Sequence, residues 1–375
     1  MKFDMQLIGP AALALLTALV VSFLMTPVVK SFAYKVGAID VPKDERRMHH
    51  KPIPRLGGLA IFAGFMASIL LFVDIRLNPQ MQSILLGAVI IVVLGVVDDI
   101  MALPAKLKFV VQIVAALIPA LNGVSIQALS NPNLFSTNAY WVLNWLSVPI
   151  TVLWIVGITN AVNLIDGLDG LCGGISVIIL TVIAMLAVIE GRGDVEMIAL
   201  ILVGATLGFL IYNAHPASIF MGDCGALFLG FIISAISLLG FKSSTIMTLA
   251  LPLLLLALPI IDTLSAILRR TLKGHKFSEA DKSHIHHLLM NKFGHKNTVI
   301  IMCIVTALFG LTAYVYMINK GIGLISLFVI MLAVDLFIEG SGMISDKYHP
   351  ILSVSRRIIR RLTRKKTITD SDRTD

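Results

Sequence analysis

Two adjacent carboxylates at the end of an apolar stretch are the first residues of this sequence that could carry out chemistry. Asp98 and Asp99 directly follow the segment ILLGAVIIVVLGVV. At a membrane boundary the two charges repel each other unless a cation or a basic group is near. Lys106 and Lys108 could supply that charge, although they lie seven or more residues further along the chain. The alternative is a plain solvated helix end.

Three further oxygen-bearing side chains recur at every third position of the segment NLIDGLDG, namely Asn163, Asp166 and Asp169. This spacing places them along one face of a helix end or turn. Carboxylates that act together with substrate phosphate oxygens suit Mg²⁺, and the glycines allow a phosphate or a sugar to approach the backbone. A turn at the membrane interface without a ligand is the alternative.

Asp223 stands between glycines in the segment FMGDCG, directly before another apolar run. Carboxylates that come from separate spans and converge on one face are more costly than a loop requires, which argues for a shared metal ion. Phe220, three residues upstream, is a candidate substrate-binding residue because it could stack on a nucleobase. The alternative for this side chain is a membrane anchor.

The basic segment 265–297 contains three clustered histidines, His284, His286 and His287. Among the lysines and arginines of this segment, their imidazoles are expected to hydrogen-bond phosphate groups. A zinc site is not favoured, because the segment lacks the HExxH pattern and no cysteine lies nearby.

A second basic segment runs from Lys43 to Arg55 and includes Lys51. Its two prolines keep it extended, and the following Gly57 and Gly58 permit a close approach to the backbone. A lipid phosphate is the expected ligand.

The composition indicates the environment in which these residues act. Of the 375 residues, 57% are hydrophobic and 14% are charged, and the mean hydropathy is +0.91. These values are typical of a polytopic membrane protein. The three cysteines, at positions 172, 224 and 303, show no CxxC spacing, so neither a disulfide framework nor a zinc ribbon is implied.

The elements that must position the polar residues are membrane helices, so the expected fold class is all-α, a polytopic membrane helix bundle. A span takes about 20 apolar residues. On this rule eleven transmembrane helices are expected, at residues 7–29, 56–73, 81–97, 107–121, 145–163, 173–189, 196–212, 225–240, 245–264, 298–317 and 322–338.

The distribution of positive charge predicts the orientation. If the amino end lies outside, the predicted cytoplasmic segments contain 25 Lys and Arg residues and the outer segments contain five. The positive-inside rule favours this arrangement, with the carboxyl end in the cytoplasm and the candidate site at the cytoplasmic face. The net charge of +8 is then explained by orientation and by anionic lipid, and no nucleic acid partner is expected.

The expected domain organisation is a transmembrane domain at 1–340 followed by a basic cytoplasmic tail at 341–375. The tail mixes lysines and arginines with apolar residues, which predicts an amphipathic segment on the surface of the lipid bilayer. No internal repeat is evident in the sequence, so a transporter built from two similar halves gains no support.

Five segments, in order, resemble the polyprenyl-phosphate N-acetylhexosamine-1-phosphate transferase family, of the glycosyltransferase 4 type: KPIPRLGG, GVVDD, NLIDGLDG, FMGDCG and HIHH. The resemblance implies an eleven-helix fold, dependence on Mg²⁺ or Mn²⁺, a UDP-sugar donor and undecaprenyl phosphate as the acceptor. It also implies the cytoplasmic membrane of a bacterium. A homodimer is left open.

Within this family, KPIPRLGG and HIHH look like the branch that uses UDP-N-acetylglucosamine and begins teichoic acid linkage units or O-antigen-type glycans. The sister branch, the phospho-N-acetylmuramoyl-pentapeptide transferase of peptidoglycan synthesis, more typically has three consecutive histidines. Where the first branch often has an acidic third position in DDxxD, this chain has Ala102, so a metal role for that whole motif stays open.

The resemblance also implies roles for single residues. Asp98 and Asp99 would lie near the lipid phosphate, with Asp98 as a candidate base. Asp223 would be the main metal ligand, with Asp99 and Asp169 as further candidates. The other implied roles are donor binding by Asn163, Asp166 and Asp169, contact with donor phosphates by His284, His286 and His287, neutralisation of phosphate charge by Lys51, and recognition of the donor sugar by Arg269 or Arg270.

The implied reaction is attack by a lipid phosphate oxygen on the phosphorus next to the sugar of UDP-N-acetylglucosamine, with release of UMP. Positioning and charge neutralisation would supply the catalysis. A rival of another class is an ion-coupled membrane transporter, which should carry ionisable groups near the midpoints of its spans. An intramembrane metalloprotease would need a ligand spacing that HIHH does not provide.

Overall fold

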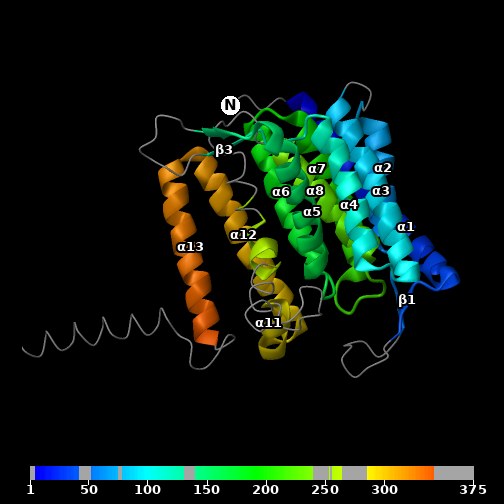
Figure 1. Ribbon diagram of the computed structural model, residues 1–375. Helices are drawn as coiled ribbons and strands as arrows, with labels where there is room; N and C mark the ends of the chain where they lie inside the picture. Colours follow the sequence, from blue (N-terminus) through cyan, green and yellow to red (C-terminus); the bar gives the residue numbers. More distant parts are fainter. Residues whose placement is uncertain are drawn as a thin grey trace, which may run out of the picture. The chain divides into compact units, whose positions relative to one another are not determined.

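The computed structural model of the protein describes residues 5–41, 52–74, 78–130, 140–239, 253, 256–263 and 285–341. The chain forms two compact units, residues 1–314 and residues 315–375. Most of the described residues are helical (Figure 1). The helices are α1 (Met5–Val36), α2 (Gly58–Phe72), α3 (Pro79–Met101), α4 (Ala105–Leu121), α5 (Ser147–Ile165), α6 (Leu171–Ile189), α7 (Gly193–Asn213), α8 (Gly222–Leu239), α11 (Ile285–Phe293), α12 (His295–Ile318) and α13 (Lys320–Ser341).

Among the described residues, seven helices are long and apolar enough to cross a membrane. They are Gly9–Val36, Pro79–Met101, Asn144–Ile165, Leu171–Ile189, Gly193–Asn213, Gly222–Leu239 and His295–Ile318. Ten of the eleven predicted spans coincide with a helix, whereas 245–264 lies mainly outside the described residues. The prediction of a polytopic helical membrane protein is therefore confirmed. The tail at 342–375 also lies outside the described residues.

Two short strand pairs depart from the expected all-α fold. Strand β1 (Ile39–Asp40) pairs antiparallel with β2 (Ile53–Pro54), and β3 (Ala128–Ser130) pairs with β4 (Tyr140–Val142). Both pairs occur where the chain has left a helix and its backbone groups need new partners. A pattern of two or three residues is too short to be recognised as a strand from the sequence.

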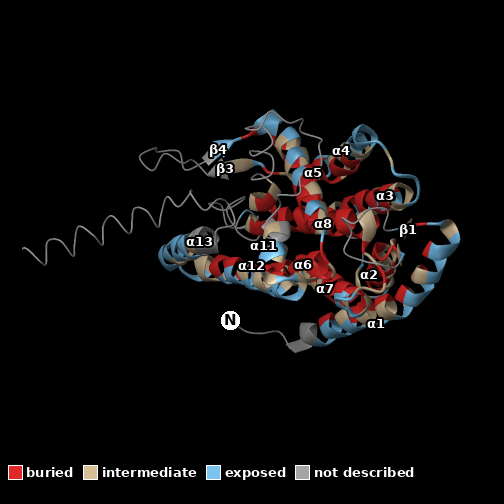
Figure 2. Cartoon of the chain, turned by 90° about the horizontal axis from the view of Figure 1, so that it is seen from below, coloured by how far each residue is buried: buried red, intermediate tan, exposed pale blue. Residues whose placement is uncertain are grey.

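The outer face of α1 is suited to lipid. Leu13, Leu16, Val20, Leu24 and Val28 are all about half exposed or more. Ala14 and Ala18, by contrast, are fully buried. Small residues on the inner face let α1 and its neighbours approach closely, as is typical of membrane helices. Other apolar side chains are also exposed, and Figure 2 shows exposed residues along the outer side of α1, so this face fits a bilayer.

Helix α8 lies at the centre of the first unit. Every residue from Cys224 to Leu239 is buried, and the helix packs against α2, α3, α5, α6 and α7 (Figure 2). Glycines make this packing possible. A Cβ atom on Gly95 would overlap the backbone at Cys224, and one on Gly230 would lie 2.8 Å from the Cα of Thr159.

Four helices bring the candidate residues to one end of the unit. Helix α3 packs against α4 and α8, and α5 also packs against α4 and α8. Helices α3 and α5 end, and α4 and α8 begin, at the lower end of the bundle in Figure 1. The helix ends that carry Asp98, Lys108, Asn163 and Asp223 are therefore neighbours although the sequence separates them.

Candidate active site

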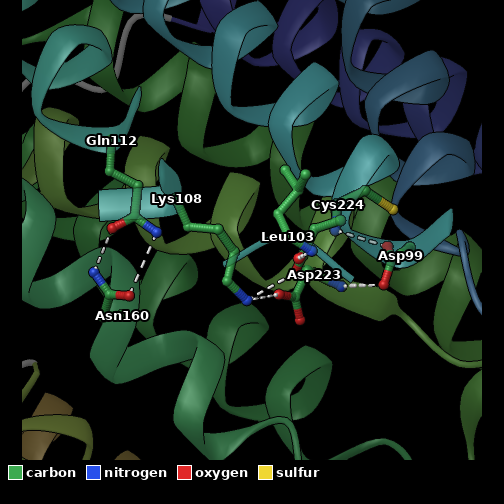
Figure 3. A network of polar contacts seen from close by, with 8 residues as sticks. Asp99, Leu103, Lys108, Gln112, Asn160, Asp223 and Cys224 are labelled. Atoms are coloured by element: carbon green, nitrogen blue, oxygen red, sulfur yellow. Dashed lines mark hydrogen bonds and ion pairs between the residues drawn. The ribbon is translucent and has the colours of Figure 1, made fainter. Parts of the chain in front are cut away.

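Lys108 joins carboxylates from two other helices. Its Nζ atom lies 2.8 Å from Asp98 Oδ2 and 3.3 Å from Asp223 Oδ2 (Figure 3). The other oxygen of Asp98 accepts the backbone N–H of Leu103 at 2.8 Å. Helix α3 ends at Ala102 in a left-handed conformation (φ 51°), and Pro104 precedes α4, so the chain turns back at once and returns Lys108 to Asp98. Of the two lysines that the sequence offers as partners of Asp98 and Asp99, Lys108 pairs with Asp98.

Asp99 has a different task from its neighbour in the sequence. Its two oxygens accept the backbone N–H groups of Asp223 at 3.0 Å and Cys224 at 3.1 Å. These groups belong to the first turn of α8, where a carboxylate satisfies unpaired donors and interacts favourably with the helix dipole. Gly222 has φ 72°, and a Cβ atom there would lie 2.5 Å from Asp99 Oδ2. Asp99 therefore fixes the backbone that presents Asp223.

The KPIPRLGG and FMGDCG segments lie side by side. The N–H of Phe220 donates to Pro54 O at 2.8 Å, that of Gly57 to Phe220 O at 2.9 Å, and that of Gly58 to Met221 O at 2.8 Å. A Cβ atom on Gly57 would lie 2.6 Å from Phe220 O. The close approach predicted at the two glycines is therefore made by protein backbone, where the sequence had suggested a lipid phosphate.

Asp166 follows α5 and is surrounded by negative charge. Removal from water raises its pKa to about 7, with further contributions from the charges of Asp223 and Asp99 and partial compensation by Arg55. Arg55 itself pairs with Asp40 at 3.1 Å. Among the described residues, the carboxylates of this region thus outnumber the basic groups.

Such a donor set fits a divalent metal ion. Hard carboxylate oxygens that share a site with substrate phosphates are the ligands that Mg²⁺ prefers. Asp98 and Asp223 share Lys108 as a common cationic neighbour, so their carboxylates lie close together. The residues present therefore fit the metal that the sequence motifs imply.

Asp169 belongs to a separate cluster with two histidines. Its Oδ2 atom lies 2.8 Å from His215 Nδ1 and accepts the N–H of Ala217 at 3.1 Å. The backbone N–H of Asp169 donates to His295 Nε2 at 3.1 Å, and the two imidazole rings stack with centroids 4.1 Å apart. These three side chains offer metal-ligand atoms within 4.8 Å of one another. The cluster ties the loop after α5 to the loop after α7 and to the start of α12.

Several predicted site residues lie outside the described residues, namely Lys51, Arg269, Arg270 and His284. His286 and His287 are on α11, which ends at Phe293, and only Gly294 separates it from His295 at the start of α12. The sequence interpretation did not include Lys108, Arg55, His215 or His295 among the site residues. The sequence offers Lys108 only as a countercharge for the acidic pair, and His215 and His295 meet Asp169 across 46 and 126 residues.

This arrangement defines a helical membrane protein with clustered carboxylates and a lysine at one end of its bundle, and the comparisons with known proteins assign its family. Residues 81–241 match Glycosyl transferase family 4. The chain is 42% identical to the probable undecaprenyl-phosphate N-acetylglucosaminyl 1-phosphate transferase of Bacillus subtilis, with 93% of this chain and 97% of the relative covered. The chain belongs to glycosyl transferase family 4.

Two other relatives give the range of the family. The decaprenyl-phosphate N-acetylglucosaminephosphotransferase of Mycobacterium tuberculosis is 32% identical, with 78% of each chain covered. The phospho-N-acetylmuramoyl-pentapeptide-transferase of Halalkalibacterium halodurans is 28% identical, with 80% of this chain and 95% of the relative covered. The resemblance read from the motifs is confirmed, and the protein is a transferase of this family.

Proposed function

We propose that the protein transfers N-acetylglucosamine-1-phosphate from UDP-N-acetylglucosamine to undecaprenyl phosphate and releases UMP. The observation that carries this proposal is the 42% identity to the Bacillus subtilis transferase over nearly the whole of both chains, against 28% to a pentapeptide transferase. The product would start a lipid-linked glycan of the cell envelope, either a teichoic acid linkage unit or an O-antigen-like chain.

The chemistry follows from the charges at the site. A phosphate oxygen of the lipid attacks the phosphorus next to the sugar, and the bond from that phosphorus to the UMP oxygen breaks. Lys108 lies between Asp98 and Asp223 and is available to hold the acceptor phosphate. Asp98, held by Leu103 and Lys108, would take the proton that this phosphate still carries.

Asp223 is the proposed principal ligand of a Mg²⁺ or Mn²⁺ ion, and Asp166 adds negative charge nearby. When bound, the ion would neutralise the donor pyrophosphate. Asp99 and Asp169 remain candidate ligands, but their oxygens already accept backbone N–H groups. The donor would lie toward Asn163, Asp166, Asp169 and Phe220, with the histidines of HIHH at its phosphates.

The proposed setting is the bacterial cytoplasmic membrane, with eleven spans, the amino end outside and the site at the cytoplasmic face. The supporting argument is the distribution of Lys and Arg, with 25 in the segments assigned to the cytoplasm and five in the others. A homodimer stays a prediction.

The test is UMP release by the purified full-length protein in detergent with Mg²⁺, undecaprenyl phosphate and a panel of UDP-sugars. UDP-N-acetylglucosamine should give UMP, and Asp223→Asn should abolish the release. UMP from the N-acetylmuramoyl-pentapeptide donor alone would assign the protein to the sister branch, and no UMP from any donor would refute the proposal.

A further inference from the structure

Two amide side chains form a reciprocal pair inside the helix bundle. The Nδ2 atom of Asn160, on α5, donates to Gln112 Oε1, on α4, at 2.6 Å, and Gln112 Nε2 donates back to Asn160 Oδ1 at 3.4 Å (Figure 3). Asn160 Nδ2 also donates to Val156 O within its own helix at 2.8 Å. Only 3% of Gln112 is exposed. Primary amides are rare in membrane helices unless they have a purpose, because each must find partners away from water.

The pair lies next to the candidate active site on both helices. Gln112 is one helical turn from Lys108 and on the same face of α4. Asn160 is three residues before Asn163 on α5, again on the same face. The two hydrogen bonds therefore connect the helix that supplies Lys108 with the helix that leads to Asn163 and Asp166.

The packing of α4 indicates what these hydrogen bonds do. From Ala105 to Val111 no residue of the helix is buried, and Gln112 is its first buried residue. Leu107, Phe109 and Val110 point outward and are about half exposed. Contacts of such apolar side chains with lipid have no preferred direction, so they cannot fix the rotation of the helix about its axis. Hydrogen bonds can fix this rotation, because they are directional.

We propose that Gln112 and Asn160 are positioning residues that set the rotation of α4 against α5 and so hold the Lys108 ammonium between Asp98 and Asp223. Neither amide contacts the proposed reacting atoms. The expected loss of turnover rests on the proposed function, whereas the placement of Lys108 can be measured without any assay of activity. A displacement of about 1 Å at a catalytic group can reduce the rate by as much as about 100-fold.

The key variant removes both amides together. Gln112→Met with Asn160→Leu keeps the side-chain volumes similar and leaves no unpaired polar group, so the protein should fold. The exchange variant, Gln112→Asn with Asn160→Gln, keeps two amides across the same interface. Ser68→Ala is the matched control, because Ser68 Oγ donates a buried hydrogen bond to Ala14 O at 2.7 Å between α2 and α1, away from the site.

Two measurements decide the matter. The first is the rate of acylation of Lys108 by an amine-reactive reagent, followed by mass spectrometry, with the exposed Lys106 as the internal reference. The second is kcat, with KM for each substrate and the midpoint of thermal unfolding. The double apolar variant should label Lys108 several-fold faster and lose about tenfold or more in kcat, with little change in unfolding midpoint. The exchange variant should restore the wild-type labelling rate of Lys108 and the wild-type kcat. Ser68→Ala should change neither the labelling rate nor kcat.

If the double apolar variant labels Lys108 at the wild-type rate and keeps the wild-type kcat, the pair only stabilises the bundle and the inference is wrong. The same holds if kcat falls only in proportion to the unfolding midpoint in all variants. If the wild-type protein releases no UMP, the proposed function fails, and the labelling of Lys108 still decides the positioning role.

Discussion

The carboxylate of Asp99 accepts the backbone N–H of Asp223 at 3.0 Å, so the end of α3 caps the start of α8. A second hydrogen bond, from the N–H of Cys224 at 3.1 Å, completes the cap. Two neighbouring aspartates on α3 thus serve different purposes, because Asp98 faces Lys108 and Asp99 holds the backbone of Asp223. This division predicts that their variants fail in different ways.

Asp99→Ala should lower the stability of the protein. The variant loses the acceptors for two N–H groups in the first turn of α8, and the loss of a helix cap costs about 1–2 kcal/mol. The midpoint of thermal unfolding in detergent should fall accordingly. Asp98→Asn, which leaves the cap intact, is the comparison and should reduce turnover with a smaller change in midpoint. An Asp99→Ala protein that unfolds at the wild-type temperature would contradict the capping role.

Lys108→Met should abolish most of the activity. Removal of a single group that stabilises developing or substrate charge typically costs about 100-fold to 1000-fold in kcat. The variant also leaves Asp98 and Asp223 without their common cation, so Mg²⁺ should raise its unfolding midpoint more than that of the wild type. Lys106→Met changes an exposed neighbour and should behave as the wild type. Equal activities of the two variants would exclude a role for Lys108.

Much of the helical framework could be predicted because apolar runs of membrane length leave few alternatives for the backbone. The acidic residues could be grouped by orientation alone, since Asp98 and Asp223 adjoin apolar runs whose predicted directions bring them to the same face. The bridge by Lys108 to Asp223 could not be predicted, because it depends on which helices pack around α8.

The glycines and histidines show more clearly which contacts cannot be predicted from the sequence. A sequence identifies a glycine that permits a close neighbour but does not identify the neighbour, so the packing of Gly58 against the backbone at Gly225 could not be predicted. The cluster of Asp169 with His215 and His295 joins residues 46 and 126 positions apart. Nothing in the spacing of these residues indicates that they meet.

His215→Gln should weaken the binding of the donor more than it slows turnover. His215 holds the Asp169 carboxylate at 2.8 Å, and the proposed donor site includes Asp169. Without this contact, the loop after α5 loses one of the interactions that hold it in place. KM for UDP-N-acetylglucosamine should therefore rise by about tenfold, while KM for the lipid phosphate stays constant. Steady-state kinetics with each substrate varied in turn will check this. A change confined to kcat would instead assign His215 to the chemical step.

The raised pKa of Asp166 predicts how stability depends on pH and on Mg²⁺. The pKa of Asp166 is about 7 in the folded protein and 3.8 for an unperturbed aspartate, the value expected in the unfolded chain. Between these two pH values the folded chain therefore retains a proton that the unfolded chain has lost. Its contribution to stability is therefore fully present below about pH 4 and is lost as the pH rises through about 7.

Mg²⁺ should reverse this loss, because it replaces the proton as the neutralising charge near Asp166. The gain in unfolding midpoint on addition of Mg²⁺ should therefore be larger at about pH 8 than at about pH 6. Asp166→Asn removes this titrating group and should reduce the dependence of the midpoint on pH in the metal-free protein. Thermal unfolding of both proteins across this range, with Mg²⁺ or with EDTA, is the measurement. If the wild type and Asp166→Asn gave parallel curves, another group would be responsible for the titration.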